Sequence, residues 1–236
     1  MNPETGLFYD LHVHSALSPC ADNDMTPAAI AGFLALSGAE VIAVTDHNSA
    51  KNLPAVKKAC DHYGIRLIPG IEANTSEEIH LLCYFPEIGA ALDMGERIYE
   101  TLPDISADRS IWGEQLIIDE NDRVTGRVEK LLTLASGFSI YELKAMTEKL
   151  GGTAVPAHAD KDSYSLISVM GFLPEDLDFK TVELTRPCGY EEYQKTGVLP
   201  GGLNIITNSD AHALTTLTRE PLPALGYDHP LTRLIL

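Results

Sequence analysis

The chain of 236 residues has few basic side chains and no long apolar segment. Lysine and arginine number 17 against 34 acidic residues, which gives a formal net charge of −17. Proteins that hold long nucleic acid usually present a basic face, so we expect no such partner. The most apolar stretch, residues 28–45, is broken by Gly32, Gly38 and Glu40. A membrane span needs about 20 uninterrupted apolar residues, so we also expect no membrane partner.

Cysteine is scarce as well. The chain has four cysteines and no Cys-x-x-Cys pair, which is typical of reduced thiols in a cytoplasmic protein: Cys20, Cys60, Cys83 and Cys188. For Cys20 we expect a small buried side chain and not a metal ligand. The length and the 44% hydrophobic content suffice for a full core, and we expect a single domain over residues 1–236.

Histidine, in contrast, recurs at the ends of expected strands. His12 and His14 end the first one, and side chains two residues apart on a strand share a face, so both could bind one ion. Four further histidines lie at the ends of later expected strands: His47, His80, His158 and His212. Imidazole is the commonest protein ligand of zinc, iron and manganese ions. This recurrence predicts a metal site.

Strand and helix patterns alternate along the chain. Thr26-Pro27 predicts a capped helix that stops at Gly38, the apolar run 41–45 predicts a buried strand, and Ser139 with Glu142 predicts a capping box. Repeated strand–helix units predict a mainly parallel sheet, closed into a barrel with the site at its carboxyl-terminal mouth. Residues 86–137 interrupt the alternation and contain an expected hairpin around the turn 119–122. We interpret them as an insertion near the mouth.

Seven short motifs, in this order, resemble those of the polymerase and histidinol phosphatase (PHP) family of metal-dependent phosphoesterases. They are His12-x-His14, Ser15…Asp22…Thr26-Pro27, Thr45-Asp46-His47, Pro69-Gly-Ile-Glu72, Glu78-Ile-His80, Ala157-His158 and Ser209-Asp210-Ala-His212. The resemblance covers nearly the whole chain outside the insertion. It implies an α/β fold, a distorted seven-stranded (β/α) barrel similar to a TIM barrel, whose mouth binds up to three divalent ions.

Carried over position by position, the family pattern implies three groups of metal ligands. They are His12, His14, Glu72 and Asp210; Asp22, His47 and His212; and Glu72, His80 and His158. Six imidazoles with three carboxylates suit zinc, manganese or iron better than calcium or magnesium, so we expect two or three such ions. Asp24 remains a rival to Asp22, which has the better spacing to Thr26-Pro27.

Other residues near these motifs have catalytic, orienting or substrate-binding roles to consider. We expect Glu72, Asp210 and His158 to be catalytic. Asp10 and Asp46 either orient imidazoles or bind backbone, and Lys161 and Arg186 either bind substrate phosphate or are surface charges. In the insertion, Trp112 and Tyr99 either stack on a base or pack against apolar neighbours. We expect His62 and His229 to face solvent without binding metal.

The resemblance and the ligand chemistry together predict a metal-dependent phosphoesterase. Metal-activated hydroxide would attack a small phosphate ester, with nucleotides among the candidate substrates. Bound cations reverse the local charge, so the acidic surface does not exclude a phosphate substrate. Two alternatives stay open at this point. One is a histidinol phosphatase, and the other is a metal-bearing PHP module without catalytic activity.

Overall fold

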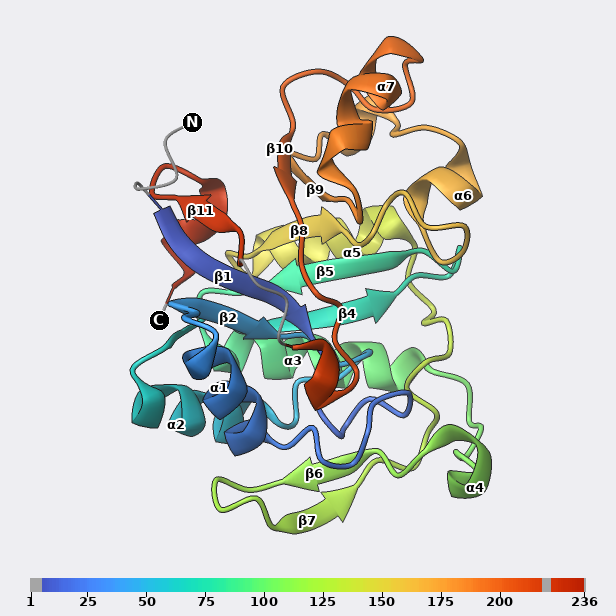
Figure 1. Ribbon diagram of the computed structural model, residues 1–236. Coiled ribbons are helices and arrows are strands. Elements are labelled where there is room, and N and C mark those ends of the chain that lie inside the picture. The colour runs from blue at the N-terminus through green and yellow to red at the C-terminus, as the bar shows by residue number, and fades with distance from the viewer. Residues whose placement is uncertain (1–5, 218–221, 236) are drawn as a thin grey trace.

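The computed structural model describes residues 6–217 and 222–235 (Figure 1). The first sheet has the order β11-β1-β2-β3. Strands β1 (Gly6–Val13), β2 (Val41–Val44) and β3 (Arg66–Leu67) run parallel, and β11 (Ala224–Gly226) pairs antiparallel with β1. All four residues of β2 are buried, as its continuous apolar sequence predicts.

The second sheet is antiparallel throughout, which corrects the expectation of a mainly parallel sheet. It contains β4 (Gly70–Asn74), β5 (His80–Tyr84) and β8 (Thr153–Pro156). Only residues 75–79 join β4 to β5, whereas a parallel crossover needs about a dozen residues or more. The short connection therefore forces an antiparallel pair.

The remaining strands form two small sheets, a parallel pair and a hairpin: β9 (Thr181–Glu183) with β10 (Asn204–Ile206), and β6 (Leu116–Ile118) with β7 (Val124–Arg127). Isolated bridges, Val13 to Ala211 and His47 to Glu72, connect the sheets near the ends of their strands. The α/β class is confirmed. Within the described residues, however, the ladders stay separate and do not close into a TIM-like barrel.

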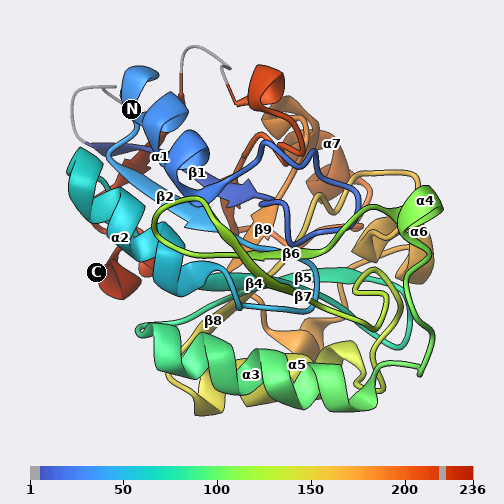
Figure 2. The same cartoon turned by 90° about the horizontal axis from the view of Figure 1, so that it is seen from below.

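Helices cover the sheets on the outside. Helices α1 (Pro27–Leu36) and α2 (Leu53–Tyr63) pack side by side, α3 (Ile88–Thr101) packs on β4, and α5 (Ile140–Lys149) packs on β5 and β8 (Figure 2). The expected Thr26 cap and the expected Ser139–Glu142 capping box are both present. The shorter helices are α4 (Arg109–Trp112), α6 (Leu166–Met170), α7 (Tyr190–Lys195), η1 (Glu175–Leu177), η2 (Pro187–Gly189), η3 (Leu214–Thr216) and η4 (Pro230–Leu234).

The segment expected to be an insertion divides into two parts. Its first part, α3, belongs to the core, because Ala91, Met94 and Ile98 are fully buried. Its second part contains the expected hairpin, β6–β7, below the sheets in Figure 1. The Leu116 N–H donates to the Ala16 carbonyl at 2.7 Å, which ties the hairpin to the loop after β1.

Composition also led us to expect no membrane-spanning helix and four unpaired cysteines. None of the described helices has the length and apolar character that a membrane crossing requires. The four cysteines are unpaired, with Cys60 and Cys83 buried. Cys20 is exposed, so the expectation of a buried side chain there is wrong. It lies in the irregular loop between β1 and α1, where no sheet covers it.

Candidate metal centre

Glu72 is a buried carboxylate at the middle of a cluster of imidazoles. It lies on β4 with only 1% of its side chain exposed. Its oxygens lie 3.3 Å from Nε2 of His12 and of His14, 3.0 Å from Nδ1 of His47, 2.9 Å from Nδ1 of His80 and 3.1 Å from Nε2 of His158. These residues come from strand ends that are distant in sequence. The fold therefore brings side chains from separate sequence motifs into one cluster.

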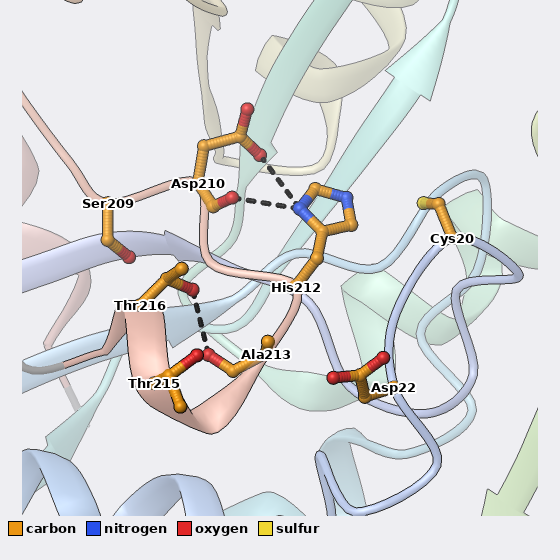
Figure 3. Close-up of a pocket in the computed structure, with 8 residues that line it drawn as sticks. All are labelled: Cys20, Asp22, Ser209, Asp210, His212, Ala213, Thr215 and Thr216. Carbon is orange, nitrogen blue, oxygen red and sulfur yellow. Dashed lines mark hydrogen bonds and ion pairs between the residues drawn. The ribbon is translucent and has the colours of Figure 1, made fainter.

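Asp210 is the second carboxylate of the cluster. Its Oδ1 lies 3.3 Å from Nε2 of both His12 and His14. The ring of His14 stacks on that of His212 with centroids 4.1 Å apart. Figure 3 shows Asp210 and His212 on the segment that follows β10. The structure thus brings His212 to the same centre from the last motif of the sequence.

Backbone strain marks the two strand ends that deliver His158 and Asp210. Their φ angles are 28° and 52°, in the left-handed region that non-glycine residues rarely adopt. Such strain persists where the surrounding structure fixes it, and it is frequent at functional sites. Neighbouring contacts supply that restraint, because the His158 N–H donates to Glu183 at 2.7 Å and Ala211 bridges to Val13.

Acceptors behind the rings of His12 and His212 fix their tautomers. Nδ1 of His12 lies 3.0 Å from Oε2 of Glu183, and Nδ1 of His212 lies 2.8 Å from the carbonyl oxygen of Asp210. A carboxylate and a carbonyl can only accept, so each Nδ1 donates its proton. When each ring is neutral, Nε2 carries the lone pair that a metal ligand requires.

A hydroxyl relay orients His14 in the same way. The Ser18 hydroxyl donates to Oδ1 of Asp46 at 2.7 Å, so its oxygen is free to accept from Nδ1 of His14 at 2.9 Å. Asp46 therefore acts on the imidazole through Ser18. Asp10 contacts no ring in this way; its Oδ1 accepts from the backbone N–H groups of His12 at 3.4 Å and Ser209 at 3.2 Å.

Glu183 is a residue of the site that sequence reasoning missed. It is buried on β9, it accepts from His12 and from the His158 backbone, and the amide of Asn208 donates to it at 2.6 Å. The available signal was a lone acidic residue in the segment 181–184, which is otherwise uncharged. A buried carboxylate is rarely left without partners, so such a residue indicates a polar network.

The carboxylates shift the pKa values of the cluster in the metal-free chain. Burial disfavours the charged form of His14 and His47, but Glu72, with Asp210 at His14, outweighs this and raises the pKa of both rings to about 9. Burial lowers the pKa of His80 to about 4 and that of His212 to about 3. Metal binding at His14 and His47 must therefore displace protons.

The donor chemistry of the cluster fits divalent transition metals. Among the residues that the structure describes, three groups have ligand atoms within 4.8 Å of one another: His12, His14 and Asp210; His14, His47 and His212; and His47, Glu72 and His80. Nδ1 of His158 is buried and has no hydrogen-bond partner among the described residues. Converging imidazoles and carboxylates suit zinc, iron or manganese. The groups differ from the expected ones, since Asp22 and His158 are in none of them.

Asp22 nevertheless lies at the edge of the centre. It lines one pocket with Cys20, Asp210 and His212, shown in Figure 3, and its N–H donates to the His212 carbonyl at 2.8 Å. Asp24 does not line this pocket, and its carbonyl accepts from the Thr26 N–H. The placement favours Asp22 over its rival as a ligand.

Lys161 and Arg186 line a second, polar pocket beside His158 and Asp210. Nζ of Lys161 lies 2.5 Å from Oδ2 of Asp210. The guanidinium of Arg186 has no hydrogen bond or ion pair within residues 6–217 and 222–235, while its backbone N–H donates to Asp160 at 3.2 Å. Two cationic side chains therefore face a cavity that adjoins the metal centre.

The remaining candidates separate clearly. Trp112 lines a third pocket at the centre, whereas Tyr99 packs against the core with Lys130 over its ring. His62 is exposed, as expected. His229 is partly buried and caps η4 by accepting from the Leu231 N–H at 3.2 Å, so the expectation that it faces solvent is wrong.

Comparison with known proteins identifies the family. The sequence model of the PHP domain matches residues 10–149, more than half of the chain. The chain belongs to the PHP domain family. This confirms the resemblance drawn from the motifs and, at the level of the family, the expectation of a metal-dependent hydrolase. The match ends before His158, Asp210 and His212, which the structure nevertheless brings to the same centre.

Similar proteins include one curated relative and several solved structures. The chain is 26% identical to the 5'-3' exoribonuclease Rnm of Salmonella typhimurium over 141 residues, 57% of this chain and 45% of the relative. The lesion-specific endonuclease PfuEndoQ of Pyrococcus furiosus has a TM-score of 0.60 at 20% identity over 88% of this chain and 49% of its own. The chain thus spans about half the length of either nuclease.

A third similar protein matches over its full length. A protein from Bifidobacterium adolescentis, described as a candidate metal-dependent phosphoesterase, has a TM-score of 0.61 at 18% identity. The match covers 98% of this chain and 97% of that one. At this identity the two solved structures establish the shared fold.

The expectation that long nucleic acid is excluded is wrong. Similar proteins include an exoribonuclease, an endonuclease and a structure of endonuclease Q with a 27-mer duplex. The physical error lies in treating net charge as a property of the site. Salt screens exposed charges beyond about 8–10 Å, and cations bound in the centre set the local sign. A net charge of −17 therefore does not decide which phosphate compounds reach the centre.

Proposed function

We propose that the chain is a metal-dependent phosphoesterase acting on phosphate esters of nucleotides, including small ones. The observation that carries the proposal is the convergence of imidazoles on Glu72 and Asp210, next to the cationic pocket of Lys161 and Arg186. Such a centre combines ligands for several cations with a place for an anionic group. The similar proteins that act on nucleic acid support the same class of substrate.

The ligands we propose are those expected from the motifs: His12, His14, Asp22, His47, Glu72, His80, His158, Asp210 and His212. Divalent ions held there would lower the pKa of a bound water toward about 7 and neutralise phosphate oxygens. Glu72 faces several imidazoles at once and would fix the spacing between sites. Glu183 and the Ser18–Asp46 pair would keep His12 and His14 in the ligating tautomer.

Lys161 and Arg186 would bind oxygens of the substrate that do not react. Arg186 is exposed on the polar pocket, and a guanidinium can bind a phosphate through two parallel hydrogen bonds. Nζ of Lys161 contacts Asp210 in the metal-free chain. When Asp210 binds a cation, the Lys161 ammonium can turn toward the anionic group in the pocket.

The test is hydrolysis by purified protein reconstituted separately with Mn²⁺, Zn²⁺ and Fe²⁺. Substrates should include nucleoside monophosphates, 5'-phosphorylated RNA and DNA oligonucleotides, sugar phosphates and histidinol phosphate. We expect metal-dependent hydrolysis of the nucleotide substrates. A clear preference for histidinol phosphate, or for carboxylic amides, would replace the proposal. Full metal binding without hydrolysis of any substrate would instead support a non-catalytic PHP module.

A further inference from the structure

One side of the metal centre is an apolar cleft with a cavity of about 470 Å³. His47 and His80 line it, and the same two rings form a donor group with Glu72. Its other walls include Trp112 and Tyr164. The two other pockets at the centre are lined mainly by polar and charged side chains. The cleft is therefore a distinct environment in direct contact with candidate metal ligands.

Large aromatic surfaces at the rim of the cleft are open to solvent. Trp112 is 49% exposed and Tyr164 is 47% exposed, beside Ile111 at 69%. Apolar side chains of this size, gathered at one rim, are typical of a binding surface. The Tyr164 ring also stacks on the His80 ring, with centroids 5.0 Å apart and planes 24° apart. A flat aromatic surface thus extends outward from a candidate metal ligand.

The backbone fixes both aromatic residues in place. Tyr164 has a φ of 52°, rare for a non-glycine residue, and its carbonyl accepts from the His80 N–H at 3.0 Å. Gly113, next to Trp112, has a φ of 86°, and a Cβ there would lie 2.4 Å from the Pro19 carbonyl oxygen. This close approach is possible only for glycine, and it lets the end of α4 lie against the loop after β1.

We propose that the cleft binds the nucleobase of the substrate, stacked on Trp112 and Tyr164, while the attached phosphate lies at the metal centre. This inference rests on the proposed function, because it assumes a phosphate at that centre. A nucleobase presents a flat π face of the kind that such side chains bind, whichever base it is. The cleft would then separate nucleotides from phosphate esters that have no aromatic group.

Trp112 provides a direct signal, because the chain has one tryptophan. Zn²⁺-loaded protein is mixed rapidly with adenosine 5'-monophosphate or with ribose 5-phosphate, which differ by the base alone. The nucleotide should quench Trp112 fluorescence in a saturable way and bind about tenfold or more tightly than the sugar phosphate, as expected for base stacking. Ribose 5-phosphate should leave the fluorescence unchanged.

Substitutions assign the effect to the cleft. Tyr164→Ala should weaken nucleotide binding about tenfold and leave ribose 5-phosphate binding unchanged. Tyr164→Phe keeps the ring and should bind the nucleotide as tightly as the wild type. Trp112→Ala and Trp112→Phe, compared by calorimetry, should show the same contrast. Tyr141 is the matched control: it is an exposed tyrosine on α5, 44% exposed, outside the cleft. Tyr141→Ala should change neither affinity.

The outcomes distinguish this inference from the proposed function. Equal affinities of the wild-type protein for the two ligands, or equal losses in Tyr164→Ala, would overturn the base site alone. Tighter competition by decyl phosphate than by the nucleotide would assign the cleft to aliphatic chains and also overturn it. Binding of both ligands with the expected difference, but no hydrolysis, would refute the proposed function and leave the base site standing. Absence of binding by either ligand would refute both.

Discussion

The imidazoles of the metal centre fall into two groups that differ in how the protein holds their rings. In the tethered group, an oxygen behind each ring accepts a hydrogen bond from Nδ1–H, and the members are His12, His14 and His212. In the Glu72 group, a ring nitrogen of each histidine faces the same carboxylate at 2.9 to 3.1 Å: His47, His80 and His158. The rings of the tethered group are oriented by several separate partners. The rings of the Glu72 group depend on a single carboxylate.

This difference has an energetic consequence. A ring that is already oriented loses little freedom when it binds a metal, so the tethered group should bind its ion without rearrangement. Within residues 6–217 and 222–235, the Glu72 group has no comparable set of acceptors behind its rings, and these rings repel one another when protonated. Loss of Glu72 should therefore disturb the centre more than loss of any single tether.

The largest expected effect is that of Glu72→Gln. The substitution keeps the shape of the side chain and removes the negative charge that faces the imidazoles. We expect the loss of at least one metal equivalent per chain and a fall in turnover of about a thousandfold, since metal ions contribute several kcal/mol to such reactions. Metal analysis and hydrolysis assays measure the two effects.

Glu96→Gln is the control for this substitution. Glu96 forms an exposed ion pair with Lys51, and neither residue lines the three pockets at the centre, so its replacement should change neither metal content nor turnover. If Glu72→Gln kept its full metal content and activity, the dependence of its group on a single carboxylate would be disproved.

The next effect is that of Glu183→Ala, which removes the acceptor behind His12. Replacing such a partner typically weakens metal binding by about 10- to 100-fold, so we expect a loss in this range. Glu183→Gln keeps an acceptor oxygen and should lose less. Competition with a chelator gives the affinities, and a larger loss in Glu183→Gln than in Glu183→Ala would contradict orientation by hydrogen bonding.

The same logic applies to the tether of His14. Ser18→Ala removes the hydroxyl that joins Asp46 to the ring, and it should weaken metal binding by a factor comparable to that of Glu183→Ala. Equal affinity in the variant and the wild type would mean that the stacking of His14 on His212 suffices to orient the ring.

The pH dependence of metal uptake compares one ring from each group. The pKa of His14 and of His47 is raised to about 9, so at pH 7 both hold a proton that a metal ion must displace. We expect affinity to rise with pH up to about 9 and then to level off. Calorimetry in buffers of different ionisation enthalpy should detect proton release at pH 7.

The stability of the metal-free protein should fall with rising pH, whereas its metal affinity rises. A histidine with a raised pKa stabilises the fold fully below its unfolded value of about 6.5, and this contribution is lost as the pH rises through about 9. The melting temperature of the metal-free chain should therefore fall over this interval because of these two rings. A metal affinity that is flat from pH 6.5 to 9 would contradict the protonated state of His14 and His47.

The smallest effects belong to the histidines outside both groups. His62→Ala changes an exposed side chain and should leave turnover and stability near wild type. His229→Ala removes the cap of η4, so it should cost about 1 kcal/mol of stability while turnover stays within a small factor. Large losses of activity in both would show that the assays report general stability.

Local signals predicted much of this molecule. Thr26 with Pro27 and Ser139 with Glu142 gave correct helix starts, because capping depends on residues within one turn. Histidines at strand ends predicted the cluster, although His80 opens β5 and so lies at its amino end. The short connection 75–79 is itself a signal for the antiparallel pair of β4 and β5. The general alternation of strands and helices predicted a parallel sheet instead.

The partners behind the rings could not be predicted in the same way. Glu183 contacts His12 across 171 positions of sequence, and only the tertiary fold brings the two side chains together. Ser18 resembles any loop serine until its hydroxyl is seen between Asp46 and His14. Trp112 lines the pocket beside His47 and His80, next to the close approach of Gly113 to Pro19, and no local sequence pattern predicts this placement.

Metal stoichiometry tests the central claim most directly. The chain is stripped with a chelator, reloaded with Zn²⁺ or Mn²⁺, freed of loosely bound ions and measured by elemental analysis. Two groups of oriented imidazoles sharing Glu72 predict two to three ions per chain, and at least one fewer in Glu72→Gln. One ion or none in the reloaded wild-type protein, with its fold intact, would contradict the assignment of these residues as a multinuclear metal centre.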